Sequence, residues 1–309
     1  MKAETKSPPA ARRLVLTLAA TTVLSTLGAS AGEPASNGWL DNTISPVVNP
    51  IFFEDPRIGS EVRPIFMEHY LPSTFHFKGG SVPLGGDVQV FALQLRYAVS
   101  DRLAIIATKD GYIDFRPDNT LSHSHGWADL AAGLKYALID DRDDQFIVTP
   151  GFTITAPSGS TAVFQGRGAG EWNLFVSAEK GCDKFHTTAN IGFRLPNDWA
   201  AQTAQSHYSL QFDYFVHQYF IPFVAVNGYT VLSQGDHKLL GAVPLNAEMY
   251  DLINFGATDA QWSTQVTVGG GVRSRLTPAL DLGASYEVGV VDPKGIFQAR
   301  VTADMIWRF

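Results

Sequence analysis

The end of the chain, residues 297–309, alternates between apolar and polar side chains. Every second residue from the end is apolar or small, in the order Phe309, Trp307, Met305, Ala303, Val301, Ala299, Phe297. The residues between them are polar apart from Ile306. A period of two is the signature of a β-strand with one apolar and one polar face. The strand runs to an aromatic terminal residue, where soluble domains usually fray.

Segments with the same alternation recur along most of the chain. They lie at 62–71, 87–99, 102–114, 126–138, 145–157, 170–180, 183–195, 205–217, 219–231, 262–276, 279–291 and 296–309. Soluble strands have roughly 5–6 residues, whereas a tilted strand that crosses a membrane needs roughly 9–11, and most of these segments are longer still. The pattern predicts an all-β fold, a transmembrane antiparallel up-and-down β-barrel of about 12 strands over residues 62–309.

The connections between these segments alternate between short and long, with short turns such as Ser100-Asp101 and Thr277-Pro278. Short turns at one rim and long loops at the other are typical of outer-membrane barrels. In this topology Trp127, Trp172 and Trp262 fall at the outer rim, and a second aromatic group falls at the inner rim: Tyr97, Tyr136, Tyr214, Tyr219, Trp307 and Phe309. Two aromatic girdles predict location in the bacterial cell outer membrane, with its lipids as partners.

The first residues of the chain differ from the predicted barrel. A basic region (Lys2 to Arg13), an apolar region and the motif Ala29-Ser30-Ala31 predict a signal peptide over residues 1–31. Residues 32–61 are rich in Pro and Phe and show no regular period. We expect this segment either to enter the barrel as a plug or to lie at its periplasmic rim.

Composition excludes some classes of function. The net charge is -7, which argues against a nucleic-acid partner. Cys182 is the single cysteine, so the chain has no intramolecular disulfide. No motif predicts a cofactor, a metal site or a catalytic residue.

Ionisable side chains gather on the faces predicted to point inward, whereas Lys109 is the main charged residue predicted on the lipid face. The pore-lining candidates are Arg96, Asp129, Lys135, Glu171, Arg194, Asp213, Arg273, Arg275, Asp281, Glu287, Arg300 and Asp304. A polar interior is expected because a charge facing lipid costs about 2–4 kcal/mol at the bilayer midplane. The charged groups either line a water-filled solute pathway or pair with one another and fill a narrow lumen.

Two predicted loops could carry further functions. His123-Ser124-His125, with Asp118 nearby, could bind a metal ion or, through Ser124, act as a hydrolase, and Ser206-His207 is a second weak candidate. The loop 232–261 is long and partly apolar, and could fold inward as a constriction or lid.

The predicted barrel resembles a family of small outer-membrane barrels, the phenol-degradation-pathway (MetA-like) transporter family. The resemblance rests on the signal peptide, the long strands, Gly-x-x-Tyr stretches such as Gly133-Leu134-Lys135-Tyr136, and the terminal Phe309, the kind of end that the barrel-assembly machinery recognises. It implies a channel for passive passage of small, hydrophobic or aromatic solutes. The alternatives are an outer-membrane lipid hydrolase and a structural or adhesive barrel with a filled lumen.

Overall fold

The computed structural model describes residues 38–77, 79–236, 246, 248–249, 251–292 and 295–309. The predicted signal peptide lies outside these residues. Among the described residues, no helix has the length and apolarity needed to span a bilayer.

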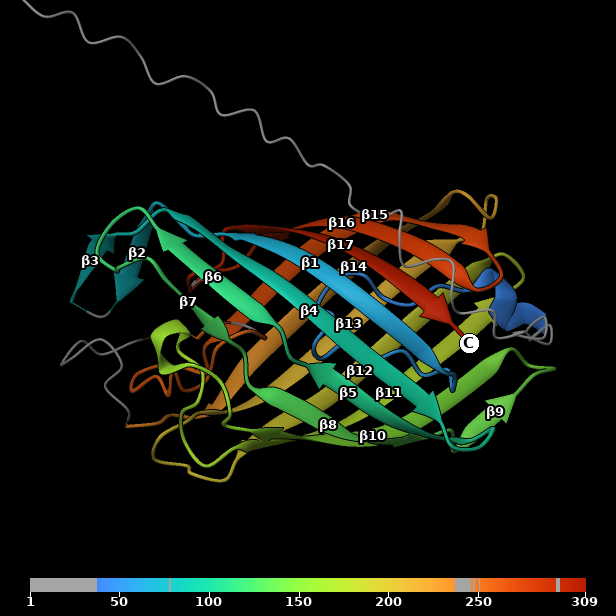
Figure 1. Cartoon of the computed structure of the whole chain (residues 1–309), viewed down its shortest axis with the longest axis horizontal. Helices are drawn as coiled ribbons and strands as arrows, with labels where there is room; N and C mark the ends of the chain where they lie inside the picture. Colours follow the sequence, from blue (N-terminus) through green and yellow to red (C-terminus); the bar gives the residue numbers. More distant parts are fainter. Residues whose placement is uncertain (1–37, 78, 237–245, 247, 250, 293–294) are drawn as a thin grey trace, which may run out of the picture. The chain divides into compact units, whose positions relative to one another are not determined.

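The barrel wall consists of antiparallel strands that close on themselves (Figure 1). Its uninterrupted strands are β1 (Glu61–Tyr70), β4 (Gly86–Ala98), β10 (Phe146–Ala156), β11 (Glu171–Cys182), β12 (Phe185–Pro196), β13 (Ala204–Tyr214), β14 (Ile221–Ser233), β15 (Thr264–Thr277), β16 (Leu280–Gly289) and β17 (Ala299–Arg308). β1 pairs with β17 on one side and with β4 on the other, so no edge strand remains. The prediction of a twelve-stranded all-β barrel is confirmed.

Two wall strands are interrupted where the sequence predicted continuous ones. Residues 102–114 form β5 (Leu103–Lys109) and the start of β6 (Tyr112–Pro117), and residues 126–138 form the end of β7 (Ser124–Trp127) and β8 (Leu130–Tyr136). Leu93 of β4 lies opposite the first interruption, and its N–H donates to the Asp110 carboxylate (N···O 2.8 Å). The polypeptide can turn here because Gly111 takes a φ of 116°, where a Cβ would lie 2.5 Å from the carbonyl oxygen of Phe91.

This irregularity corrects the prediction for Lys109. The pairing of β5 with β8 shifts register between Ala107 and Lys109. A one-residue shift exchanges the two faces of a strand, so Lys109 is buried instead of facing lipid. Its Nζ lies 4.0 Å from Oδ2 of Asp129, at the matching interruption of the neighbouring strand.

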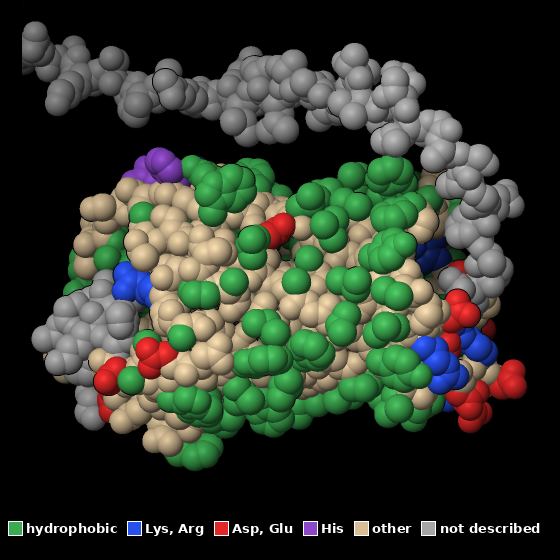
Figure 2. Space-filling model, turned by 60° about the horizontal axis from the view of Figure 1, so that its bottom comes forward, with side chains coloured by type: hydrophobic (Ala, Val, Ile, Leu, Met, Phe, Trp, Pro, Cys, Tyr) green, Lys and Arg blue, Asp and Glu red, His purple; other side chains and the backbone are tan. Residues whose placement is uncertain are grey.

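The outward face of the wall is apolar and the charged groups gather at its ends. Figure 2 shows hydrophobic side chains spread over the flank, with acidic and basic side chains mainly near the two ends. All the aromatic residues predicted for the two girdles are exposed, from Trp127 and Trp262 to Tyr97 and Phe309. Strict alternation produces this surface because each strand turns every second side chain outward.

The longer connections carry the remaining elements. β2 (Thr74–Phe77) and β3 (Gly80–Pro83) form a hairpin beyond β1, and η2 (Thr161–Val163) follows β10. At the opposite end of the barrel lie η1 (Gly38–Asn42) and β9 (Ile139–Asp141), which extends β10 (Figure 1). The hairpin end therefore holds long loops, and the η1 end holds mostly short turns.

Candidate functional site in the barrel lumen

Residues 43–57 run through the interior of the barrel, held by side chains of the wall. Arg63, Gln94 and Thr149 donate hydrogen bonds to the carbonyl oxygens of Pro46, Pro50 and Pro56, each at 2.6 Å. Further carbonyls accept from Ser177 of β11 and from Arg273 and Arg275 of β15. A Pro-rich segment cannot form a regular ladder, so its buried carbonyls need side-chain donors.

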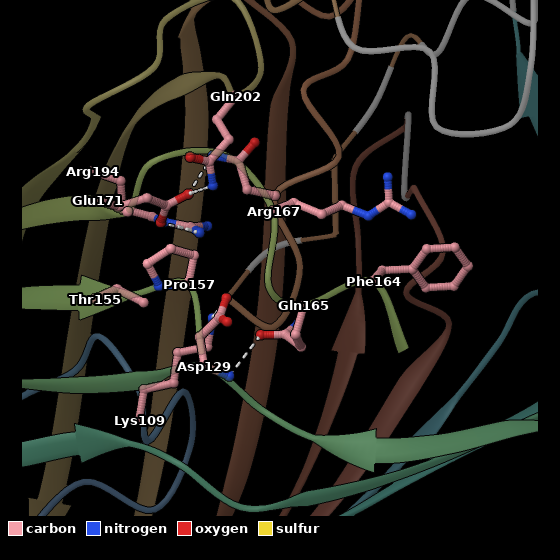
Figure 3. Close-up of a pocket in the computed structure, with 12 residues that line it drawn as sticks. Lys109, Asp129, Thr155, Pro157, Phe164, Gln165, Arg167, Glu171, Arg194 and Gln202 are labelled. Atoms are coloured by element: carbon pink, nitrogen blue, oxygen red, sulfur yellow. Dashed lines mark hydrogen bonds and ion pairs between the residues drawn. The ribbon is translucent and has the colours of Figure 1, made fainter. Parts of the chain in front are cut away.

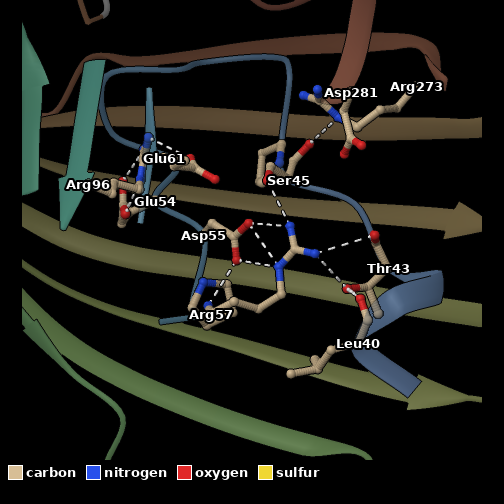
Figure 4. Close-up of polar contacts among 12 residues, drawn as sticks. Leu40, Thr43, Ser45, Glu54, Asp55, Arg57, Glu61, Arg96, Arg273 and Asp281 are labelled. Atoms are coloured by element: carbon tan, nitrogen blue, oxygen red, sulfur yellow. Dashed lines mark hydrogen bonds and ion pairs between the residues drawn. The ribbon is translucent and has the colours of Figure 1, made fainter. Parts of the chain in front are cut away.

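Glu54 is the most connected charge of this segment. Its carboxylate accepts from Arg96 (2.8 and 2.6 Å) and from Lys135 (2.8 Å), and it is 2% exposed. Arg57 in turn pairs with Asp55 and donates to Thr43 and Ser45, which folds the segment back on itself (Figure 4). Buried charges of this kind are stable only when each one is paired.

The structure places the predicted pore-lining residues inside the barrel, all buried except the half-buried Arg275. Every one of them except Asp213 takes part in an ion pair. The pairs are Arg96–Glu54, Lys135–Glu54, Asp129–Lys109, Glu171–Arg194, Arg273–Asp304, Arg275–Asp281, Glu287–Arg300, and Arg300–Asp251. Asp213 is hydrogen-bonded to His186 at 2.7 Å. The charges therefore form networks in this conformation, and their role in lining a solute route remains a prediction.

The hairpin-end half of the lumen is apolar on one side. Inward-facing residues of β1, β4 and β6, such as Met67, Val90 and Phe115, belong to one buried cluster with Leu252 and Phe255 of the β14–β15 loop. The same cluster reaches Ile51 and Phe52 in the inserted segment. The prediction of a polar interior is therefore wrong for this part of the barrel, because the inner faces of these strands change from polar to apolar along their length.

Phe52 marks the point where the apolar cluster meets the charged networks. Its ring stacks on His207 (centroids 4.9 Å apart), and the Arg194 guanidinium lies 5.0 Å from the ring centroid. Tyr229 of β14 approaches the same ring edge-on at 6.3 Å. Phe52 therefore contacts both the apolar cluster and the charged networks.

A small polar chamber lies beside this junction (Figure 3). Glu171 accepts from Arg194 (2.6 Å), from Gln202 (2.7 Å) and from Asn254 (2.8 Å). Asp129, also at the chamber, accepts from the backbone N–H groups of Gly159 and Gly166 at 2.9 and 2.8 Å. Asp129 thus anchors the β10–β11 loop to the wall, a role that alternation alone could not indicate.

The described part of the predicted 232–261 lid also folds inward. Met249, Leu252 and Ile253 are buried, whereas 237–245, 247 and 250 lie outside the described residues. Glu248 accepts hydrogen bonds from the N–H groups of Phe255 (2.5 Å) and Ala257 (2.8 Å) and from Thr203. Burial nevertheless raises the pKa of Glu248 to about 7, because desolvation disfavours the charged carboxylate more than these hydrogen bonds favour it.

The hydrolase and metal alternatives find no support among the described residues. Ser206 and His207 are neighbours on β13, so their side chains lie on opposite faces of the wall. His123 is exposed and pairs with Asp114 (2.6 Å), and its ring lies 6.4 Å from that of His125. Within the described ranges, no three His, Cys, Asp or Glu residues are grouped to hold a metal ion.

Sequence reasoning missed several residues that shape the lumen. Phe52 and Glu54 lie in a segment without a period, so no face could be assigned to them. Phe164 and Gln202 come from loops, whose direction depends on contacts made elsewhere. A signal for Lys109 did exist, since Thr108-Lys109-Asp110 breaks the alternation of polar and apolar residues.

Solved structures similar to this chain include two channels and an autotransporter domain. The COG4313 outer membrane channel from Pseudomonas putida F1 is 16% identical, with a TM-score of 0.56, over 86% of this chain and 100% of that one. The β domain of the Bordetella autotransporter BrkA is 11% identical, with a TM-score of 0.49, over 82% and 100%. The CymD monoaromatic hydrocarbon channel is 10% identical, with a TM-score of 0.40, over 90% and 94%. At these identities the likeness concerns the fold.

Sequence comparison identifies the family. No curated protein matches the chain. A family model matches residues 77–301, which is more than half of the chain and almost the whole barrel wall. This agrees with the resemblance found from the strand pattern and with an outer-membrane location. The chain is an outer-membrane β-barrel that belongs to the family described as "Putative MetA-pathway of phenol degradation".

Proposed function

We propose that this barrel is a passive outer-membrane channel for small hydrophobic or aromatic solutes. The observation that carries the proposal is the continuous buried apolar cluster, which extends from the β2–β3 hairpin to Phe52. Buried apolar side chains stabilise any fold, but this cluster also continues from the outer loops into the lumen. A hydrophobic solute that moves from the outer rim into the lumen needs an apolar surface to bind. Contact with the buried charged groups would cost free energy because it would displace their polar partners.

In this proposal residues 43–57 act as a plug that closes the periplasmic half of the lumen. Its carbonyls and Glu54 make bonds with β1, β4, β8, β10, β11 and β15. Solute passage then requires the plug to shift. Arg96, Lys135 and Arg273 would line the opened route once their bonds to the plug are released.

The test is to remove residues 45–56 and measure single-channel currents in planar bilayers, with vesicle swelling for uncharged solutes. We expect larger and more frequent openings than in the intact chain. A Gly/Ser segment of equal length in place of 45–56 is the control for chain connectivity, and it should behave like the deletion. Unchanged conductance in both variants would contradict the plug.

One observation favours a second candidate, a structural barrel with a filled lumen. All the predicted lining residues are paired, and the cavities described in the barrel have volumes of only about 10 to 30 Å³. This candidate predicts neither currents nor swelling, with or without residues 45–56. The same experiment therefore separates the two.

Two further proposals concern the ends of the chain. Phe309 is exposed at the end of β17, and we propose that it is the residue recognised by the barrel-assembly machinery. Deleting Phe309 should lower the amount of folded, heat-modifiable barrel in the outer membrane, while Phe220→Ala, another exposed aromatic, should not. We also propose that residues 1–31 are cleaved, which a mature N-terminus at Gly32 would verify by mass spectrometry.

A further inference from the structure

A second cavity lies at the hairpin end of the barrel, apart from the charged networks. Its volume is about 30 Å³, and apolar side chains such as Phe75, Phe115 and Phe255 line it, with Thr120 as the only polar residue among the described residues that line it. The Thr120 hydroxyl donates its proton to the Pro83 carbonyl. The described lining is therefore almost entirely apolar and favours an apolar group as the occupant.

Phe164 lies between this apolar cavity and the polar chamber, since it lines both. Its ring packs edge-on against Phe115 (5.4 Å) and Phe255 (6.0 Å), and it points away from Glu171 and Asp129 (Figure 3). Its backbone is left-handed, with φ 62° and ψ 22°, which is unfavourable for a residue with a Cβ. The loop therefore holds this ring at the boundary at some cost, and such outliers often mark functional positions.

On the other side of Phe164, the chamber contains a buried acceptor that makes no hydrogen bond. The amide nitrogen of Gln202 donates to Glu171 (2.7 Å), which fixes the orientation of the amide because a carboxylate accepts only from the NH₂ group. The remaining oxygen, Oε1, is buried and accepts from no donor among the described residues. A buried acceptor without a partner is costly, so a ligand that donates a hydrogen bond would be favoured there.

We propose that the apolar cavity, Phe164 and Gln202 together form a binding site for a small neutral amphipathic compound. Its apolar end occupies the cavity, and a hydroxyl group donates to Gln202 Oε1. The ring of Phe164 moves aside to join the two spaces, because the apolar cavity alone is smaller than an aromatic ring. A carboxylate cannot donate to the amide oxygen of Gln202 and would lie near Glu171, although Lys109, Arg167 and Arg194 also line the chamber. Its binding therefore tests the hydrogen bond to Gln202 against attraction by these cations.

This inference rests on the proposed function, but binding can be measured without transport. The test is isothermal titration calorimetry of the detergent-solubilised full chain with p-cresol, toluene and 4-methylbenzoate, with empty micelles as the blank. One additional satisfied hydrogen bond should make p-cresol bind about fivefold more tightly than toluene. 4-Methylbenzoate should bind most weakly of the three.

Gln202→Met is the decisive variant. It should remove the preference for p-cresol and leave toluene binding unchanged, whereas Gln261→Met, the same change at an exposed site, should retain the preference. Equal binding of p-cresol and toluene by the unaltered chain, or a preference that survives in Gln202→Met, would overturn the site.

A second variant protects the test if Gln202→Met does not fold. Val82→Trp, on the half-exposed rim of the apolar cavity, should fill it and abolish binding of p-cresol and toluene alike; retained binding would also overturn the site. Selective binding without solute flux would support the site and contradict the channel. Solute flux without selective binding would support the channel and contradict the site.

Discussion

The two halves of the lumen are closed in different ways. In the half at the η1 end, wall cations and amides hold the carbonyls and carboxylates of residues 43–57. In the hairpin-end half, apolar side chains of the wall and of loops pack together with few charges. Ion pairs and hydrogen bonds fix a single geometry, whereas apolar contacts are non-directional and can be exchanged for contacts with a solute. We therefore expect the half at the η1 end to resist opening and the half at the hairpin end to accept a solute.

The largest effect is expected from Glu54→Gln, which removes the charge that holds the plug. Lys135 would lose its carboxylate partner while remaining buried, and breaking a buried pair of this kind costs about 3–5 kcal/mol. We expect the plug to detach, with increased conductance and faster proteolysis of residues 43–57. Glu68→Gln, on the outer face of β1, is the control, and equal conductance of the two variants would show that the charges do not hold the plug.

A change in the apolar half should act differently. Phe255→Ala removes a buried ring, and such truncations cost about 3–5 kcal/mol, here mostly as loosening of the β14–β15 loop. We expect faster swelling of vesicles with uncharged aromatic solutes and little change in ion conductance, because the plug remains bound. An increase in ion conductance as large as that of Glu54→Gln would contradict the division into two halves.

The loop around Glu248 should respond to pH. Its pKa is raised to about 7 in the ordered loop, so protonated Glu248 stabilises that loop. This stabilisation is fully present below the ordinary pKa near 4.5 and is lost as the pH rises through about 7. Hydrogen exchange of the Phe255 and Ala257 amides should therefore be faster at pH 8 than at pH 5, after correction for intrinsic rates. In Glu248→Gln the corrected rates should no longer depend on pH; a persistent dependence would assign the effect to another group.

The smallest effect is expected at the periplasmic rim. Arg275 is half-buried, lies 3.4 Å from Asp281 and donates to the Thr43 carbonyl, but Arg308 also pairs with Asp281 at 2.7 Å. Arg275→Met should change conductance little, because Arg308 still pairs with Asp281 and the other wall side chains still hold residues 43–57. A change as large as that of Glu54→Gln would mean that the plug is held from its outer end.

The strand pattern was sufficient to predict the wall because it records a local property. β11, β12 and β13 alternate along their whole length, and a one-residue slip would expose residues such as Glu179 or Gln211 to lipid. The prediction was wrong at Lys109, where the alternation of inward and outward side chains is broken by a register shift between β5 and β8. The break in alternation at Thr108-Lys109-Asp110 marks an irregularity, but residue types on one strand do not show which way the register shifts against the neighbouring strand.

The sequence by itself determined the barrel, its closure and the inward direction of the charged residues, because lipid and water impose opposite demands on alternate side chains. Only the tertiary structure decided what fills the lumen. Glu54 pairs with Arg96 and Lys135, and Phe164 packs against Phe115 and Phe255. These residues are far apart in the sequence, and the alternation of side chains along one strand does not predict their contacts. Whether the interior is charged or apolar at a given depth follows from which segments fold into it, and those segments have irregular backbones without a period that would assign their faces.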